Sequence, residues 1–166
     1  MSKVIDADHG YNRIVKTLLK ELDGVRIQAG VQADAGNAKK RGKGGKVVKS
    51  DTPLTLIATV HEYGLNGMPQ RSFIRGAYDD NKQLIEKLTT ALASGAITSK
   101  MPLNTALNQV GNAIEGMIKT KIRDGPFNPN SSATIKRKGS SRPLIDTGHL
   151  RQSIRYKILR KGEDDG

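Results

Sequence analysis

Residues 25–32 read Val-Arg-Ile-Gln-Ala-Gly-Val-Gln, and this stretch decides the fold. Its apolar residues alternate with polar residues or glycine, which predicts a strand with one buried face. Near the other end of the chain, residues 154–159 (Ile-Arg-Tyr-Lys-Ile-Leu) alternate in much the same way. We expect these two strands to pair antiparallel, which would close the chain on itself.

Helical patterns fill most of the chain between and before the two strands. Apolar residues recur along one helical face from Tyr11 to Leu22, and Gly24 follows them. Further helices are predicted from Leu54 to Gly64 (with Thr52 as N-cap and Pro53 in the first turn), over about 72–94 and from Pro102 to Gly125. One helical turn is expected after Asp146-Thr147. The predicted fold class is therefore α+β: a small antiparallel sheet packed by about four helices, with two long basic loops, in a single domain over 1–166 with a frayed tail at 162–166.

The positive charge of the chain is concentrated in two segments. The 166 residues carry 28 Lys and Arg against 16 Asp and Glu, a net charge of +12. The excess falls in Gly-, Ser- and Asn-rich stretches, which we predict to be a flexible basic loop at about 34–49 and a second long loop at about 125–142. The residues expected to contact DNA or a partner protein are Lys39, Lys40, Arg41, Lys43, Lys46, Lys49, Lys136, Arg137, Lys138 and Arg142.

Composition leaves three interpretations of these basic segments open. Clustered Lys and Arg suit a phosphate backbone, because neutralising phosphates releases counterions. The same composition fits a solvated, mobile loop. It also fits an arm that becomes ordered on an acidic protein partner, such as a neighbouring subunit.

The sequence carries no pattern typical of an enzyme. The chain has no Cys and three His, none of which is four residues from another, and no phosphate-loop or nucleophile-elbow motif occurs. We therefore expect no catalytic residues, no metal site and no cofactor. No apolar run is long enough to span a bilayer and no signal peptide is evident, so we expect a water-soluble protein without a membrane partner.

Three motifs after residue 60 occur in a recognisable order. The first ends a predicted helix with His-Glu-Tyr-Gly, the second precedes a long helix, and the third precedes the last strand. Their residues are His61, Glu62, Tyr63 and Gly64; Pro69, Arg71 and Phe73; and Pro143, Leu144, Asp146, Thr147, Gly148 and Leu150. In themselves these residues indicate structural roles, such as a helix end at Gly64 and a core anchor at Phe73.

In order and spacing, the motifs resemble the tail-completion or neck (virion morphogenesis, head–tail joining) proteins of tailed bacteriophages. The resemblance covers roughly Leu54 to Tyr156, and one departure is Phe127, where many members have Trp. It implies a non-enzymatic structural protein of the virion that is assembled in the host cytoplasm. The implied partners are other copies in a homo-oligomeric ring, the head–tail connector or adaptor, the tail terminator or tail tube protein, and double-stranded DNA passing through the ring.

In that setting, one basic loop is expected to line the DNA channel and the other to reach an adjacent subunit or the tail terminator. The alternative function is a small basic, architectural nucleic-acid-binding protein that uses the same loops.

Overall fold

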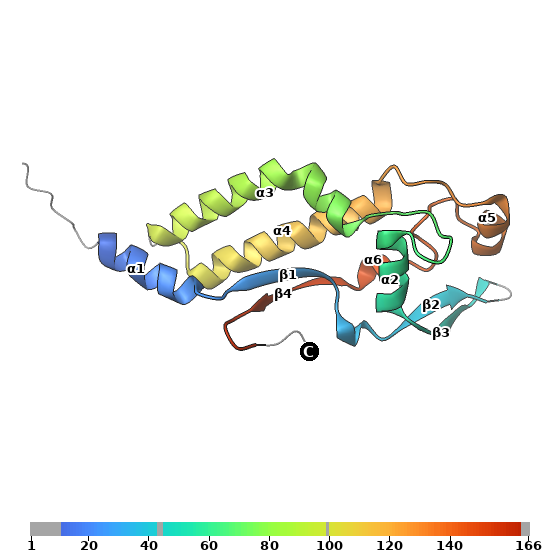
Figure 1. Cartoon of the computed structure of the whole chain (residues 1–166), viewed down its shortest axis with the longest axis horizontal. Coiled ribbons are helices and arrows are strands. Elements are labelled where there is room, and N and C mark those ends of the chain that lie inside the picture. The colour runs from blue at the N-terminus through green and yellow to red at the C-terminus, as the bar shows by residue number, and fades with distance from the viewer. Residues whose placement is uncertain (1–10, 43–44, 99, 164–166) are drawn as a thin grey trace, which may run out of the picture.

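Two long helices and a two-stranded ribbon form the body of the protein. The computed structural model describes residues 11–42, 45–98 and 100–163. In these residues the elements are, in chain order, α1 (Tyr11–Leu22), β1 (Arg26–Val31), a 3-10 turn (Ala33–Ala35), β2 (Asn37–Arg41), β3 (Val47–Pro53), α2 (Leu54–Tyr63), α3 (Ile74–Ile97), α4 (Leu103–Asp124), α5 (Ser132–Lys138), α6 (His149–Gln152) and β4 (Ile154–Leu159). Helices α3 and α4 run side by side above the β1–β4 ribbon, and α1 extends from one end of the elongated molecule (Figure 1).

The predicted pairing of the first and last strands is confirmed. Strands β1 and β4 are antiparallel, with Ile27 opposite Ile158 and Val31 opposite Ile154. The ribbon packs against α4, and the side chains of Phe73 and Ile154 are fully buried in the main core. The α+β class is confirmed, with six helices and two separate two-stranded sheets in the described residues rather than one sheet and four helices.

The helix predictions hold in position and differ at their ends. Gly64 ends α2 in the left-handed conformation, at φ 70°, as expected for a C-terminal glycine. The N-cap of α2 is Pro53 rather than Thr52, because β3 runs directly into the helix. Helix α3 continues past Gly95 to Ile97, so that glycine lies inside the helix instead of ending it.

The prediction of a loop over 34–49 is wrong at residues 37–41 and 47–49, which lie in strands. Strands β2 and β3 form an antiparallel hairpin there. The hairpin is anchored because Ala38 is buried in the main core, while the Lys and Arg beside it remain exposed. Lys and Asn have little intrinsic preference for β-strands, so the composition of β2 did not predict a strand there. The strand depends on the tertiary contact of Ala38 instead.

The prediction of an unstructured loop over 125–142 is also incomplete, because α5 lies within it. Ser131 caps this short helix by accepting a hydrogen bond from the Thr134 backbone N–H. Gly139 ends it at φ 67°. A Ser at the start and a Gly at the end are ordinary helix signals, and the sequence interpretation overlooked them. In the tail, the backbone hydrogen bonds of Arg160 and Glu163 form a turn, and residues 164–166 lie outside the described residues.

Candidate functional site

The His-Glu-Tyr-Gly motif joins α2 to α3. The Glu62 carboxylate, only 6% exposed, accepts hydrogen bonds from the backbone N–H groups of Ile74 and Arg75, at 2.9 and 3.0 Å. These N–H groups belong to the first turn of α3, where backbone donors have no acceptor within the helix. A carboxylate is therefore favoured at this end of the helix. A Cβ on Gly64 would lie 2.9 Å from the Gln70 backbone nitrogen, so the tight turn also requires the glycine. The exposed Tyr63 takes no part in this junction.

Arg71 connects the second motif to the segment after α4. Its side chain is only 3% exposed, and burial lowers its pKa. The guanidinium donates from Nε to the Asn128 carbonyl oxygen at 3.2 Å and from Nη2 to the Asn130 side-chain oxygen at 3.3 Å. No described carboxylate pairs with it. A buried positive charge therefore lies beneath the surface here. Pro69, the first residue of the second motif, is half-buried in the turn that leads to Arg71.

The third motif holds the hairpin against the body. Leu144 and Leu150 are buried in the main core. The Thr147 hydroxyl donates to the Lys39 carbonyl oxygen at 3.4 Å and accepts from the His149 backbone N–H at 3.3 Å. Gly148, at φ 79°, is the N-cap of α6. The half-buried Pro143 accepts a hydrogen bond from Lys138 through its carbonyl oxygen.

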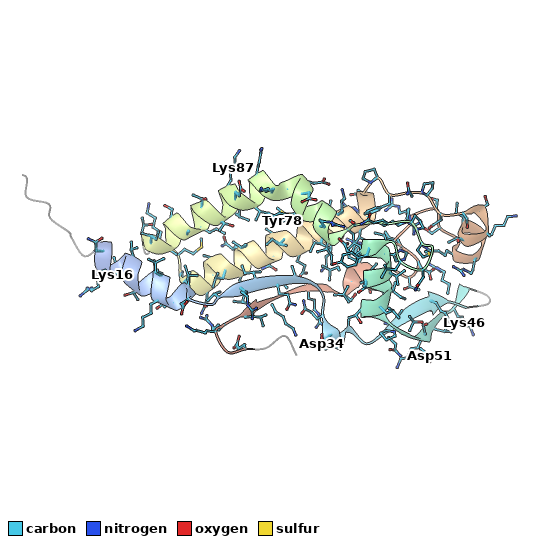
Figure 2. The ribbon with its side chains drawn as sticks, in the orientation of Figure 1. Lys16, Asp34, Lys46, Asp51, Tyr78 and Lys87 are labelled. Atoms are coloured by element: carbon cyan, nitrogen blue, oxygen red, sulfur yellow. The ribbon has the colours of Figure 1, made fainter. Side chains whose placement is uncertain are left out.

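The fold brings the two basic segments together. Cations from β2 and from α5 line the same cavity of about 560 Å³, although nearly a hundred residues separate them along the chain. A second opening lies between the hairpin turn and α5, lined by Arg41, Gly42, Gly45 and residues 136–139. Figure 1 shows the hairpin and α5 at the same end of the molecule, and Figure 2 shows Lys46 at the tip of the hairpin. We call this region, with the described cations Lys39, Lys40, Arg41, Lys46, Lys49, Lys136, Arg137 and Lys138, the basic end.

Most charges of the basic end have no acidic partner among the residues that the structure describes. Among the described residues, only Arg41 of this set has an acidic partner, with its Nε 3.7 Å from Asp146 Oδ1. Lys138 donates instead to the carbonyl oxygens of Arg142 and Pro143. Lys39 lies directly opposite Lys49 in the hairpin, and like charges in that arrangement destabilise a sheet. An anionic partner would relieve this repulsion.

The remaining predicted contact residues lie beside or outside this region. Arg142 follows α5, with its side chain exposed and without an ion pair in the described chain. Lys43 lies outside the described residues.

The larger cavity is lined by motif residues as well as by cations, and we call it the motif pocket. His61, Arg71, Asp146 and His149 line it together with Lys39, Arg41 and Lys138, above the apolar side chains of Leu54 and Leu144. Sequence interpretation assigned His61 and Arg71 to the folding motif and gave His149 no role. Nothing in the local sequence pattern could reveal that these three residues lie beside the β2–β3 hairpin.

Burial and neighbouring cations lower the pKa of both histidines of the motif pocket. The pKa of His61 is lowered to about 4, first by burial and then by the charges of Arg71 and Lys138. Burial also lowers the pKa of His149, with a smaller effect from Lys39, and it lowers the pKa of Lys138 despite the attraction of Asp146. All three pKa values are lowered for the same reason, which is that the pocket is electropositive and partly dehydrated.

Two further findings bear on function. Among the described residues, no three His, Asp or Glu side chains are grouped so that they could hold a metal ion. Within the same part of the chain, no helix combines the length and apolar character needed to cross a bilayer.

Comparison with known proteins finds no family model, no curated protein and no solved structure that matches this chain. The resemblance to phage neck proteins therefore rests on the three motifs and on their spacing.

Proposed function

We propose that this chain is a non-enzymatic structural protein of a bacteriophage neck. In this proposal, copies of it form a ring at the head–tail junction of the virion, where the ring completes or joins the tail and surrounds the path of the DNA. The connector or adaptor protein lies on one side of the ring, and the tail terminator or tail tube protein lies on the other.

The observation that carries the proposal is the convergence of the two basic segments at one end of the molecule. A surface with several cations and little internal neutralisation suits non-specific contact with a phosphate backbone. Cations of both basic segments line the same cavity, and the expectation that one segment faces DNA and the other a neighbour stays a prediction. The three motifs support the assignment to the neck, since each makes a defined contact that positions this surface.

The ring requires two different, complementary faces on each subunit, because only heterologous contacts close into rings larger than a dimer. An elongated shape with its basic surface at one end is suited to such an arrangement, with the basic ends of successive subunits turned toward a common channel (Figure 1).

Electron microscopy of particles made without this protein tests the proposal. We expect filled heads and separate tails that fail to join, and we expect the protein to restore joining when it is added back. Joined, infective particles in its absence would overturn the proposal, as would a protein that remains monomeric in assembled virions.

The alternative is an architectural nucleic-acid-binding protein. The basic end favours this alternative too, because the whole basic surface belongs to a single chain and needs no ring to form. This alternative predicts tight binding of duplex DNA by the isolated monomer, with a steep loss of affinity as salt rises. The neck proposal predicts weak binding by the monomer and an avidity gain only on assembly.

A further inference from the structure

The motif pocket contains polar atoms that the chain itself leaves unpaired. Within the described residues, three buried side-chain atoms lack a hydrogen-bond partner: His61 Nδ1, Asp146 Oδ1 and His149 Nδ1. All three residues line this one pocket. The Arg41 Nε lies 3.7 Å from Asp146 Oδ1, which is close enough for electrostatic attraction but too long for a hydrogen bond. Because unpaired buried polar atoms are costly, their concentration around one pocket marks its wall as polar and incompletely satisfied, although the atoms themselves are closed off from solvent.

The cations around the pocket favour an anion. Lys39, Lys40, Arg41, Arg71, Arg137 and Lys138 line it, against the single carboxylate of Asp146. Arg71 uses only Nε and Nη2 in its contacts within the described chain, so the donors of its Nη1 remain for a ligand.

The acceptor at Asp146 decides which kind of anion fits. A phosphodiester offers only hydrogen-bond acceptors, so it cannot pair with the Asp146 carboxylate and is repelled by it. A peptide with acidic side chains brings carboxylates for the Lys and Arg of the rim and backbone N–H donors for the Asp146 carboxylate, whose side chain is 29% exposed. Its aliphatic side-chain carbons can rest on Met68, which also lines the pocket and is 40% exposed.

We propose that the motif pocket binds an acidic peptide segment of a partner protein. The carboxylates lie among Lys39, Arg41 and Arg71, and a backbone N–H of the peptide donates to the exposed part of the Asp146 carboxylate. This inference goes beyond the proposed function, since it concerns the isolated chain and holds whether or not rings form.

The His61 imidazole supplies a spectroscopic signal for binding. The charged groups that face it are Arg71, from the segment before α3, and Lys138, from α5; both disfavour its protonation. A carboxylate bound among these cations offsets their effect and raises the pKa of His61. The chain has three histidines, and the His61→Gln variant assigns the His61 resonance.

The experiment is an NMR titration of the full chain with a capped peptide of alternating Glu and Ala, at an ionic strength where the Debye length is about 8 Å. We expect saturable shifts of the His61 resonance and a higher His61 pKa in the complex. The matched variants are Lys39→Gln and Lys49→Gln. They remove the same charge from opposite positions of one hairpin pair, but only Lys39 lines the pocket. Lys39→Gln is expected to weaken binding roughly two- to fivefold, as for loss of an exposed ion pair, and Lys49→Gln to weaken it much less.

The Asp146→Leu variant, which removes both the charge and the hydrogen-bond acceptor, distinguishes the peptide from a simple oxyanion by the sign of its effect. We expect it to weaken binding of the Glu-Ala peptide and to strengthen binding of inorganic phosphate, which the carboxylate repels. Thermal unfolding of the variant checks that it remains folded. If it does not, the comparison of Lys39→Gln with Lys49→Gln still tests the proposal.

Several results would overturn the proposal: no saturable peptide binding, equal effects of Lys39→Gln and Lys49→Gln, or stronger peptide binding by Asp146→Leu. A duplex DNA oligonucleotide that shifts His61 and displaces the peptide would also overturn it and assign the pocket to nucleic acid. These results leave the neck proposal untouched, because particle joining tests that proposal separately.

Discussion

At the scale of single residues, the motif side chains act through buried polar contacts. Glu62 satisfies backbone donors at the start of α3, and Arg71 holds the carbonyl of Asn128. Both side chains are charged and both are almost fully buried, so removing either would leave its partners unpaired. The motifs that resemble phage neck proteins therefore have clear physical reasons in this fold.

Gly111 is required by a close approach between α4 and β4. A Cβ at this position would overlap the ring of Tyr156, and the backbone of Tyr156 is held by the Glu115 carboxylate. We expect Gly111→Ala to lower the free energy of unfolding by about 1–3 kcal/mol through overpacking. The matched control is Gly116→Ala in the same helix, where a Cβ meets no heavy atom within 4 Å in the described chain.

The control is expected to stabilise the protein by about 0.5–1 kcal/mol, because alanine favours a helix interior. Urea unfolding of both variants measures these changes. Equal effects of the two substitutions would mean that Tyr156 does not pack on Gly111.

The low pKa of His61 predicts a loss of stability in acid. Burial first, and then Arg71 and Lys138, lower this pKa from 6.5 to about 4 in the folded state. Between those values the unfolded state binds the proton and the folded state does not, so stability is present above pH 6.5 and falls as the pH approaches 4. We expect His61→Gln to flatten this part of the pH profile, as measured by urea unfolding at pH 7 and pH 5. An unchanged slope would assign the acid sensitivity to other groups.

At the scale of elements, the β2–β3 hairpin contains a pair of like charges that repel each other. Because Lys39 and Lys49 face each other, Lys49→Glu should convert a repulsive pair into an attractive one and stabilise the hairpin by about 0.5–1 kcal/mol. Lys46→Glu makes the same charge change in the turn, where residue 46 has no cross-strand partner among the described pairs. Native-state amide exchange of β2 and β3 measures the opening free energy of the hairpin.

The gain from Lys49→Glu should shrink at high salt, since both side chains are exposed. If Lys46→Glu protects the hairpin equally well, then overall charge rather than the pair determines its stability.

At the scale of the whole molecule, the position of the charge should matter more than its amount. One variant replaces four exposed lysines of the basic end by Gln: Lys40, Lys46, Lys49 and Lys136. The control replaces four exposed lysines of α1 and α3: Lys16, Lys20, Lys82 and Lys87. Figure 2 shows Lys16 at the end of the molecule opposite Lys46, and Lys87 on α3. Each variant lowers the net charge of +12 by four.

We expect the basic-end variant to reduce the salt dependence of duplex DNA binding, with the slope falling by up to about 0.9 for each lost phosphate contact. The control is expected to change the slope little. Fluorescence anisotropy over a range of salt concentrations measures both, and equal slopes would show that the basic end is not the DNA contact.

The sequence alone determined the elements whose signals are local. The alternation in β1 and β4, the apolar face of α1 and the glycine that ends α2 each depend on neighbours within a few residues, and all appear where predicted. The same kind of signal was present for α5, in Ser131 and Gly139, and was overlooked because the segment looked like a loop.

Only the tertiary structure decided what the basic segments form. The hairpin exists because Ala38 reaches the core and Thr147 holds the Lys39 carbonyl, contacts that join distant parts of the chain. The same folding brings α5 beside β2 and places His61, Asp146 and His149 around one pocket. The pattern of apolar and polar residues along the chain predicts which face of its own helix or strand a side chain lies on. Which elements then meet depends on packing across the whole chain, and the pocket is a product of that packing.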